Sequence, residues 1–102
     1  MEPLVERAAA FRALGHPSRL LNFRPLVDAG PAGLNVGAIR SRIGLPASTL
    51  SHHLDALRQG GIVRSWRQER FVYHAVVPGA VEVLIDVLQG EGVWASAGSK
   101  PG

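Results

Sequence analysis

Residues 46–65 read PASTLSHHLDALRQGGIVRS, and this stretch decides the fold. Leu50, Leu54 and Leu57 recur at helical spacing, so they predict a helix over Ala47–Gln59 with one buried side. A Gly-Gly pair follows and ends that helix. Two adjacent histidines stand outside the leucine stripe. Three roles are open for them: holding a metal, acid–base chemistry, or contact with a partner.

A second short helix is predicted immediately before this one. Asn35 can cap a helix over Val36–Ile43, because an asparagine side chain accepts a hydrogen bond from the first helical turn. Gly44 ends this helix, and Leu45 and Pro46 bridge to the next one. Two short helices joined by about three residues are typical of a helix-turn-helix.

The rest of the chain predicts a mainly helical fold with a small β-hairpin, in the α+β class. β-branched and aromatic residues favour strands over residues 62–66 and 70–76. Further helices are predicted over Leu4–Leu14, Ser18–Ala29 and Ala80–Gln89. Pro25 lies inside the second of these, where a proline costs about 3 kcal/mol, so we expect a kink or a helix in two pieces.

The chain of 102 residues has the length of one domain. Residues 1–89 are expected to form that domain and residues 90–102 a flexible tail, because the tail is rich in Gly and Ser and lacks periodicity. Neither a membrane span nor a signal peptide is evident, so we expect the cytoplasm. The absence of cysteine excludes disulfides, thiolate nucleophiles and Cys-rich zinc sites.

The positive charge is concentrated in one third of the chain. The net charge of the chain is +3. The charges of residues 40–70 sum to +4, and those of the remaining residues sum to −1. A basic segment of this kind suits a phosphate-bearing partner. The alternative is a solvated basic surface with no partner.

No metal or catalytic site can be assembled around the histidines. Neighbours on a helix point about 100° apart, so His52 and His53 cannot grip one metal from the same side. The sequence contains no HExxH motif and no carboxylate pair at a spacing suited to hydrolysis. We therefore expect no metal, no cofactor and no enzymatic activity.

The polar side of the predicted helix over 47–59 is typical of a helix that reads DNA. In a helix-turn-helix the second helix enters the major groove by its first turns. The hydroxyl residues have an alternative role in starting the helix. One of the two histidines is expected to pack rather than read a base, and the sequence does not say which. The residues expected to contact DNA are Ser48, Thr49, Ser51, His52 and His53.

The hairpin that follows is a candidate wing. Arg64, Arg67 and Arg70 bracket its tip, where they can neutralise backbone phosphates beside the groove. Arg40 and Arg42 extend this footprint onto the preceding helix. The alternative for these two is a solvated surface position.

The last helix is apolar nearly all round, with seven of its ten residues apolar. Such a helix must be covered on more than one side. A small monomer has little to cover it with, so we infer that the last helix and the first one join two subunits. The residues expected at this interface are Leu4, Ala8, Phe11, Val81, Leu84, Ile85 and Leu88.

Two longer stretches resemble a known family. They are ALGHPSRL at residues 13–20 and LPASTLSHHLDALRQGGIVRSWRQERFVYH at residues 45–74. Together with the order of the elements, they are similar to the ArsR/SmtB family of winged helix-turn-helix repressors. This resemblance implies a homodimer that binds double-stranded operator DNA. The dimer dissociates from the DNA when an inducer, often a metal or metalloid ion, binds to the protein.

The departures from the family pattern bear on the inducer. Branches that sense arsenite or soft metals use cysteines, which this chain lacks. The branch that binds zinc or cobalt through its last helices uses Asp and His, whereas this last helix has Glu82 and Asp86 and no histidine. The sequence therefore leaves the inducer unknown.

Three further departures bear on the fold. Asn22 and Pro25 stand where relatives have apolar helix formers, and Glu69 stands where a wing-tip glycine is common.

A second hypothesis for the function is a protein-interaction module that keeps this fold without binding DNA.

Overall fold

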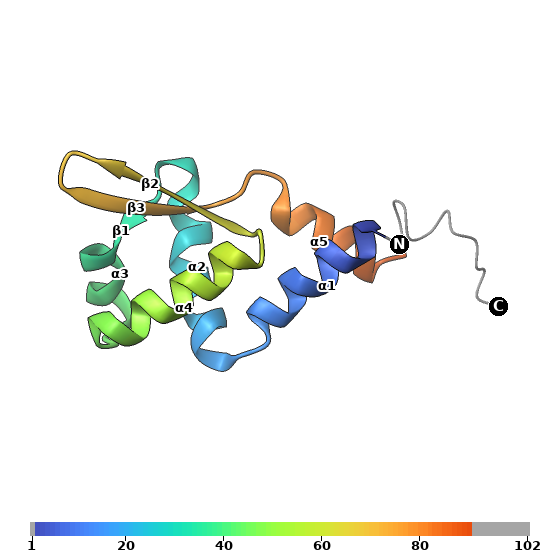
Figure 1. The fold of residues 1–102 in the computed structure, drawn as a ribbon, viewed down its shortest axis with the longest axis horizontal. Helices are drawn as coiled ribbons and strands as arrows, with labels where there is room; N and C mark the ends of the chain where they lie inside the picture. The colour runs from blue at the N-terminus through green and yellow to red at the C-terminus, as the bar shows by residue number, and fades with distance from the viewer. Residues whose placement is uncertain (1, 91–102) are drawn as a thin grey trace.

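The computed structural model describes residues 2–90, so the expected tail at 90–102 lies outside the described residues apart from its first residue. The described chain is a mainly helical winged helix-turn-helix with one small antiparallel sheet (Figure 1). Its elements are α1 (Glu2–Leu14), α2 (Pro17–Ala29), a 3₁₀ turn (Gly30–Ala32), β1 (Leu34–Asn35), α3 (Val36–Ile43), α4 (Ala47–Gln59), β2 (Val63–Gln68), β3 (Phe71–Val76) and α5 (Ala80–Leu88).

The helices α3 and α4 have the predicted bounds because their end signals are local. The Asn35 side chain accepts a hydrogen bond from the Ala38 amide at 2.8 Å, which caps α3 as expected. Gly44 has a φ of 73°, the left-handed conformation that ends a helix. The remaining helices agree with their predicted ranges to within two residues at each end.

The helix α2 runs through Pro25 without interruption, so the expected division into two pieces is wrong. Pro25 is buried together with Phe23 and Leu26, on a helix that packs against α4 and β3. Burial of these apolar groups offsets the backbone hydrogen bond that the proline removes.

The sheet has one strand more than the predicted hairpin, in the order β1-β3-β2. The extra strand β1 pairs Leu34 with His74 and Asn35 with Tyr73. The preceding Gly33 permits this approach, because a Cβ there would lie 2.5 Å from the His74 carbonyl oxygen.

The other two strands form the wing. They pair from Val63 and Val76 to Gln68 and Phe71. The turn at the tip is therefore the two residues 69–70, instead of the three residues 67–69 implied by the predicted strands.

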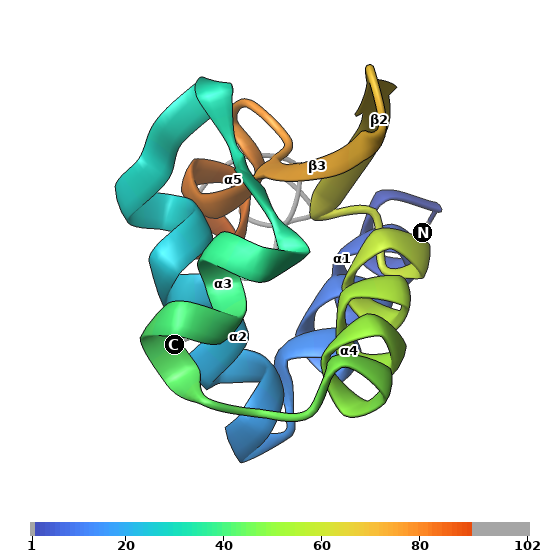
Figure 2. The ribbon, with the colours of Figure 1, turned by 90° about the vertical axis from the view of Figure 1, so that its left-hand side faces the viewer.

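The core confirms the predicted leucine stripe of α4. Leu50 and Leu57 are completely buried, Leu54 is 2% exposed, and they pack with Leu26 and Ile39. Figure 2 shows α4 across from α2 and α3, with the sheet on the upper side of the view. The helices α1 and α5 lie together at one end of the molecule, and the wing extends toward the other end (Figure 1).

Candidate nucleic-acid interface

The first turns of α4 present short polar side chains to the outside. Ser48, Ser51 and His52 are exposed, and Thr49 is half-buried. They stand on the sides of the helix that the leucine stripe leaves free. No side chain caps the start of α4 at Pro46, so the first backbone amides of α4 are not engaged by a capping residue. This surface can donate and accept hydrogen bonds over the first turns of the helix.

His53 faces the protein interior, which corrects the expectation that it contacts DNA directly. Its side chain is 6% exposed, and its Nδ1 atom accepts a hydrogen bond from Nε of Arg19 at 3.3 Å. The His16 ring lies 5.0 Å from the His53 ring, centroid to centroid. Of the two adjacent histidines, His52 is therefore the one free to reach a partner.

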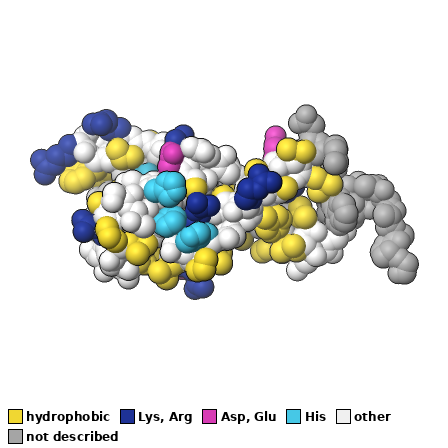
Figure 3. Space-filling model, turned by 60° about the horizontal axis from the view of Figure 1, so that its bottom comes forward, with side chains coloured by type: hydrophobic (Ala, Val, Ile, Leu, Met, Phe, Trp, Pro, Cys, Tyr) yellow, Lys and Arg dark blue, Asp and Glu magenta, His cyan; other side chains and the backbone are white. Residues whose placement is uncertain are grey.

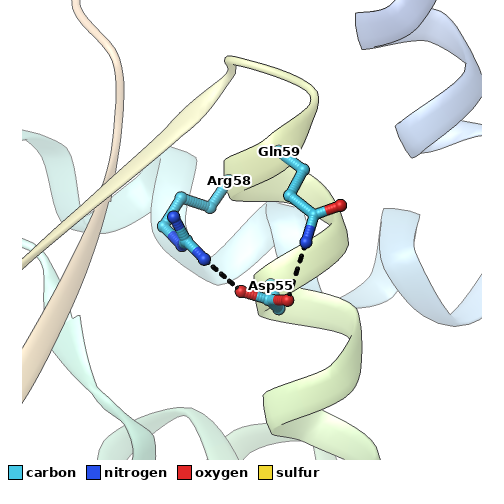
Figure 4. Close-up of polar contacts among 3 residues, drawn as sticks. All are labelled: Asp55, Arg58 and Gln59. Carbon is cyan, nitrogen blue, oxygen red and sulfur yellow. Dashed lines mark hydrogen bonds and ion pairs between the residues drawn. The ribbon is translucent and has the colours of Figure 1, made fainter.

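The last turns of α4 carry an internal ion pair. Arg58 and Asp55 form a salt bridge, and the Gln59 amide donates a second hydrogen bond to the same carboxylate at 2.9 Å (Figure 4). All three side chains are exposed. Because Asp55 offsets its charge, Arg58 is a weaker candidate for a phosphate contact than the unpaired arginines of the wing.

Aromatic side chains hold two of the wing arginines. The guanidinium of Arg64 lies 4.7 Å from the centroid of the Trp66 ring, and that of Arg70 lies 5.2 Å from the Phe71 ring. The Trp66 ring stacks on Tyr73 at a centroid distance of 5.9 Å. This packing restricts where the charges can point.

The basic side chains of the wing are exposed, as a phosphate contact requires. Arg64, Arg67 and Arg70 are all exposed. Figure 3 shows basic side chains gathered at the far end of the molecule, where the wing ends. On α3, Arg40 and Arg42 are also exposed, and Nε of Arg40 donates to the Leu45 carbonyl at 3.3 Å.

The sequence and the fold both match known transcriptional regulators. Residues 11–65 match a family model described as a helix-turn-helix domain. The regulator YgaV of Escherichia coli is 32% identical over 84 residues, which cover 82% of this chain and 83% of YgaV. A DNA-binding domain from Mycobacterium bovis, described as homodimeric and as a possible ArsR-family regulator, shares 28% identity with a TM-score of 0.70. That match covers 84% of this chain and 77% of the domain.

This chain belongs to the ArsR family of winged helix-turn-helix transcriptional regulators. A third relative of the ArsR-family chain is the transcriptional repressor PagR of Bacillus anthracis. The two share 32% identity with a TM-score of 0.70, over 83% of this chain and 94% of PagR. Membership places the protein among DNA-binding regulators of transcription rather than among enzymes.

The described part of this ArsR-family protein shows neither a clustered metal site nor a membrane-spanning helix. Within residues 2–90, no three histidine or acidic side chains come together as a potential metal site. No helix in that range is long and apolar enough to cross a membrane.

The residues expected at the dimer interface of the ArsR-family chain differ in exposure. Ile85 is 44% exposed and Leu88 is 73% exposed, while Ala8 is also exposed. Leu84 is only 8% exposed because it packs into the core of its own subunit, so we correct its assignment to the interface. Val5, which is not among the expected residues because it lies outside their helical stripe, is 60% exposed on α1. The other members are half-buried: Leu4, Phe11 and Val81.

Proposed function

We propose that this protein is a homodimeric repressor that binds a near-palindromic operator through the α4 helices of two subunits. The observation that supports this proposal most directly is the orientation of α4. Its leucines are buried, and Ser48, Ser51 and His52 are exposed on its first turns. A helix with this polarity, preceded by α3 and followed by a basic wing, suits insertion into the major groove.

The residues on α4 and on the wing have different tasks in this proposal. Ser51 and His52 carry short donor and acceptor groups that can reach base edges, so they contribute to sequence preference. Arg64, Arg67 and Arg70 are cations on a hairpin, so they neutralise phosphates of any sequence. The aromatic contacts of Arg64 and Arg70 preorder these two charges before DNA binds.

The dimer is supported by the exposed apolar residues of α1 and α5. Val5, Ile85 and Leu88 lie on two helices that contact each other at the end of the molecule away from the wing. A second copy would cover these side chains and bring two α4 helices to one duplex. Half-sites are then expected about 10 base pairs apart, centre to centre, or at a multiple of that spacing.

The repressive action is proposed from relatives. PagR is a transcriptional repressor, and its fold and sequence match most of this chain. We infer that an inducer releases the operator in the cytoplasm and that the inducer does not bind through thiolates, because the chain has no cysteine.

The experiment is a fluorescence-anisotropy titration with DNA from upstream of the protein's own coding region, repeated over a range of salt concentrations. Arg67→Ala removes one phosphate contact from each subunit, so the plot of log affinity against log salt should become less steep by about 2. The loss should be alike for all DNA sequences. Arg24→Ala is the matched control, because Arg24 is exposed on the side of α2 that carries the exposed Leu20 and Val27.

Replacement of Ser51 or His52 by alanine should instead change the preference among DNA sequences. A loss of about 1–3 kcal/mol on the preferred fragment is expected, with a smaller loss on unrelated fragments. Equal losses from the α4 and wing variants on every fragment would contradict the separation of roles. Absence of binding at low salt would favour the protein-interaction module.

A further inference from the structure

A cluster of imidazoles and one guanidinium lies where α2 meets α4, and its central residue, His53, has no part in the DNA contacts proposed above. His53 from α4 is at its centre, and Arg19 from α2 donates to it. The rings of His16 and His52 lie 5.0 Å and 5.8 Å from the His53 ring, centroid to centroid. Figure 3 shows histidine side chains gathered beside a basic side chain on this face.

The hydrogen bond between Arg19 and His53 fixes the protonation state of the imidazole. A guanidinium has donors only, so Nδ1 of His53 must carry a free lone pair to accept from it. The imidazole is therefore neutral, with its proton on Nε2. A proton added at Nδ1 would place two donors and two positive charges against each other.

A second imidazole of the cluster is also used as an acceptor. Nδ1 of His16 accepts a hydrogen bond from the Ser18 amide at 3.1 Å, which caps the start of α2. This cap fixes the His16 ring at the start of α2, beside the His53 ring.

The surroundings of His53 oppose its protonation. Burial lowers the pKa of the His53 imidazole below its ordinary value of 6.5. Positive charge on neighbouring groups lowers this pKa further, and these groups are His16 before α2, Arg19 on α2 and His52 on α4. Among the described residues, the other elements packed against α4, which are α1, α3 and β2, add no charge that shifts it.

We propose that Arg19 is a positioning residue that holds α4 in its DNA-binding orientation through His53, and that proton uptake by His53 in mildly acidic solution releases this contact and lowers operator affinity. This inference rests on the proposed function, because it concerns the helix assigned to the major groove. It adds a dependence of operator affinity on pH, and it assigns a positioning role to Arg19, which lies outside the surface proposed to face DNA.

The direction of the effect separates His53 from an exposed histidine. An exposed histidine that gains a proton near DNA adds positive charge, which strengthens binding to phosphate. Protonation of His53 weakens binding, because it breaks the contact with Arg19 that holds α4 against α2. In the unfolded chain this imidazole titrates near its ordinary pKa of 6.5, so folding loses the contribution of His53 as the pH falls below 6.5 and keeps it at higher pH. Operator binding starts from the folded protein, so it loses this contribution only below the lowered pKa of His53.

The test compares the full-length protein with His53→Asn, whose amide oxygen can take the place of Nδ1 as an acceptor but does not titrate. His52→Asn is compared at the exposed neighbour. Because His52 is proposed to face the DNA, only the change of its affinity with pH is read, not its affinity at neutral pH. Affinity for an upstream DNA fragment is measured by anisotropy between about pH 8 and pH 5 at constant ionic strength. The urea midpoint without DNA is measured over the same range.

Below the lowered pKa of His53, the dissociation constant of the natural sequence should rise relative to that of His53→Asn, by up to about tenfold per pH unit for each subunit. The urea midpoint of the natural sequence should fall as the pH drops below 6.5, while the urea midpoint of His53→Asn should fall less. His52→Asn should keep the acid loss of the natural sequence. Arg19→Met, which keeps the length but not the donor, should weaken binding about threefold to tenfold at neutral pH, whereas Arg24→Met should not.

Parallel pH profiles for the natural sequence and His53→Asn, in both measurements, would overturn the inference. Absence of DNA binding at every pH would overturn the proposed function and with it the operator part. In that case the DNA-free urea midpoints still decide whether protonation of His53 breaks the contact between α2 and α4.

Discussion

Two asparagines of this chain lie in opposite surroundings. Asn22 on α2 is completely buried, and neither atom of its amide has a hydrogen-bond partner among the described residues. Asn35 uses its side chain to cap α3. A buried amide without a partner lowers stability, whereas a helix cap raises it.

Asn22→Leu should therefore raise the free energy of unfolding by about 1–3 kcal/mol, because an apolar side chain replaces a desolvated amide. Asn35→Ala should lower it by about 1 kcal/mol. Both are measured by urea denaturation. A loss of stability in Asn22→Leu would show that the amide is satisfied in solution.

The wing carries one backbone conformation that its residue disfavours. Glu69 has a φ of 59°, which makes it the non-glycine residue with positive φ among residues 2–90. It also places a negative charge at the tip of a basic hairpin. Two substitutions separate the backbone strain at Glu69 from the repulsion between its carboxylate and the DNA phosphates.

Glu69→Gly should raise the free energy of unfolding by about 1 kcal/mol, because it removes the steric penalty of the left-handed conformation. Glu69→Gln keeps that conformation and removes only the charge. Both variants should bind DNA more tightly, and only the glycine variant should be more stable. Thermal melts and anisotropy titrations check the two effects, and equal stability of the two variants would refute the strain.

At the level of the elements, local signals explain what the sequence could predict. The helices α3 and α4 carry their own cap, stop glycines and apolar stripe, so their bounds followed from residues within each helix. The strand β1 has two residues and exists through its pairing with β3, which no local pattern announces. The continuity of α2 through Pro25 likewise depends on packing against distant segments.

The candidate site was predictable to a similar degree. The leucine stripe indicated which side of α4 is exposed, and Ser48, Ser51 and His52 lie there. The burial of His53 depends on Arg19 and His16, which α2 and the turn before it bring alongside α4. This neighbourhood is a tertiary feature, so Arg19 gave no signal in the sequence.

In the molecule as a whole, the two ends carry different kinds of surface. The wing and the first turns of α4 carry the polar and basic residues, while α1 and α5 expose apolar ones. An exposed leucine in such a place is stabilising only when another surface covers it. We therefore expect DNA affinity to depend on the assembly of two subunits.

Leu88→Glu should dissociate the dimer, because it places a charge on a residue that is 73% exposed in the single subunit and covered in the proposed pair. Sedimentation should show a monomer, and operator affinity should fall at least tenfold as the second α4 is lost. Leu20→Glu is the control, since Leu20 is 52% exposed on α2, which is outside the proposed interface. A dimer that survives Leu88→Glu would place the interface elsewhere.

The most direct test of the account is site-specific cross-linking to DNA. The chain has no cysteine, so His52→Cys offers a single attachment point for a photoactivatable reagent, and Leu21→Cys offers one on the exposed side of α2. With DNA fragments selected by the protein itself, residue 52 is predicted to cross-link to bases in the major groove of each half-site, and residue 21 is not. Cross-linking of DNA from residue 21 but not from residue 52, in a complex that still forms, would contradict the placement of α4 in the groove.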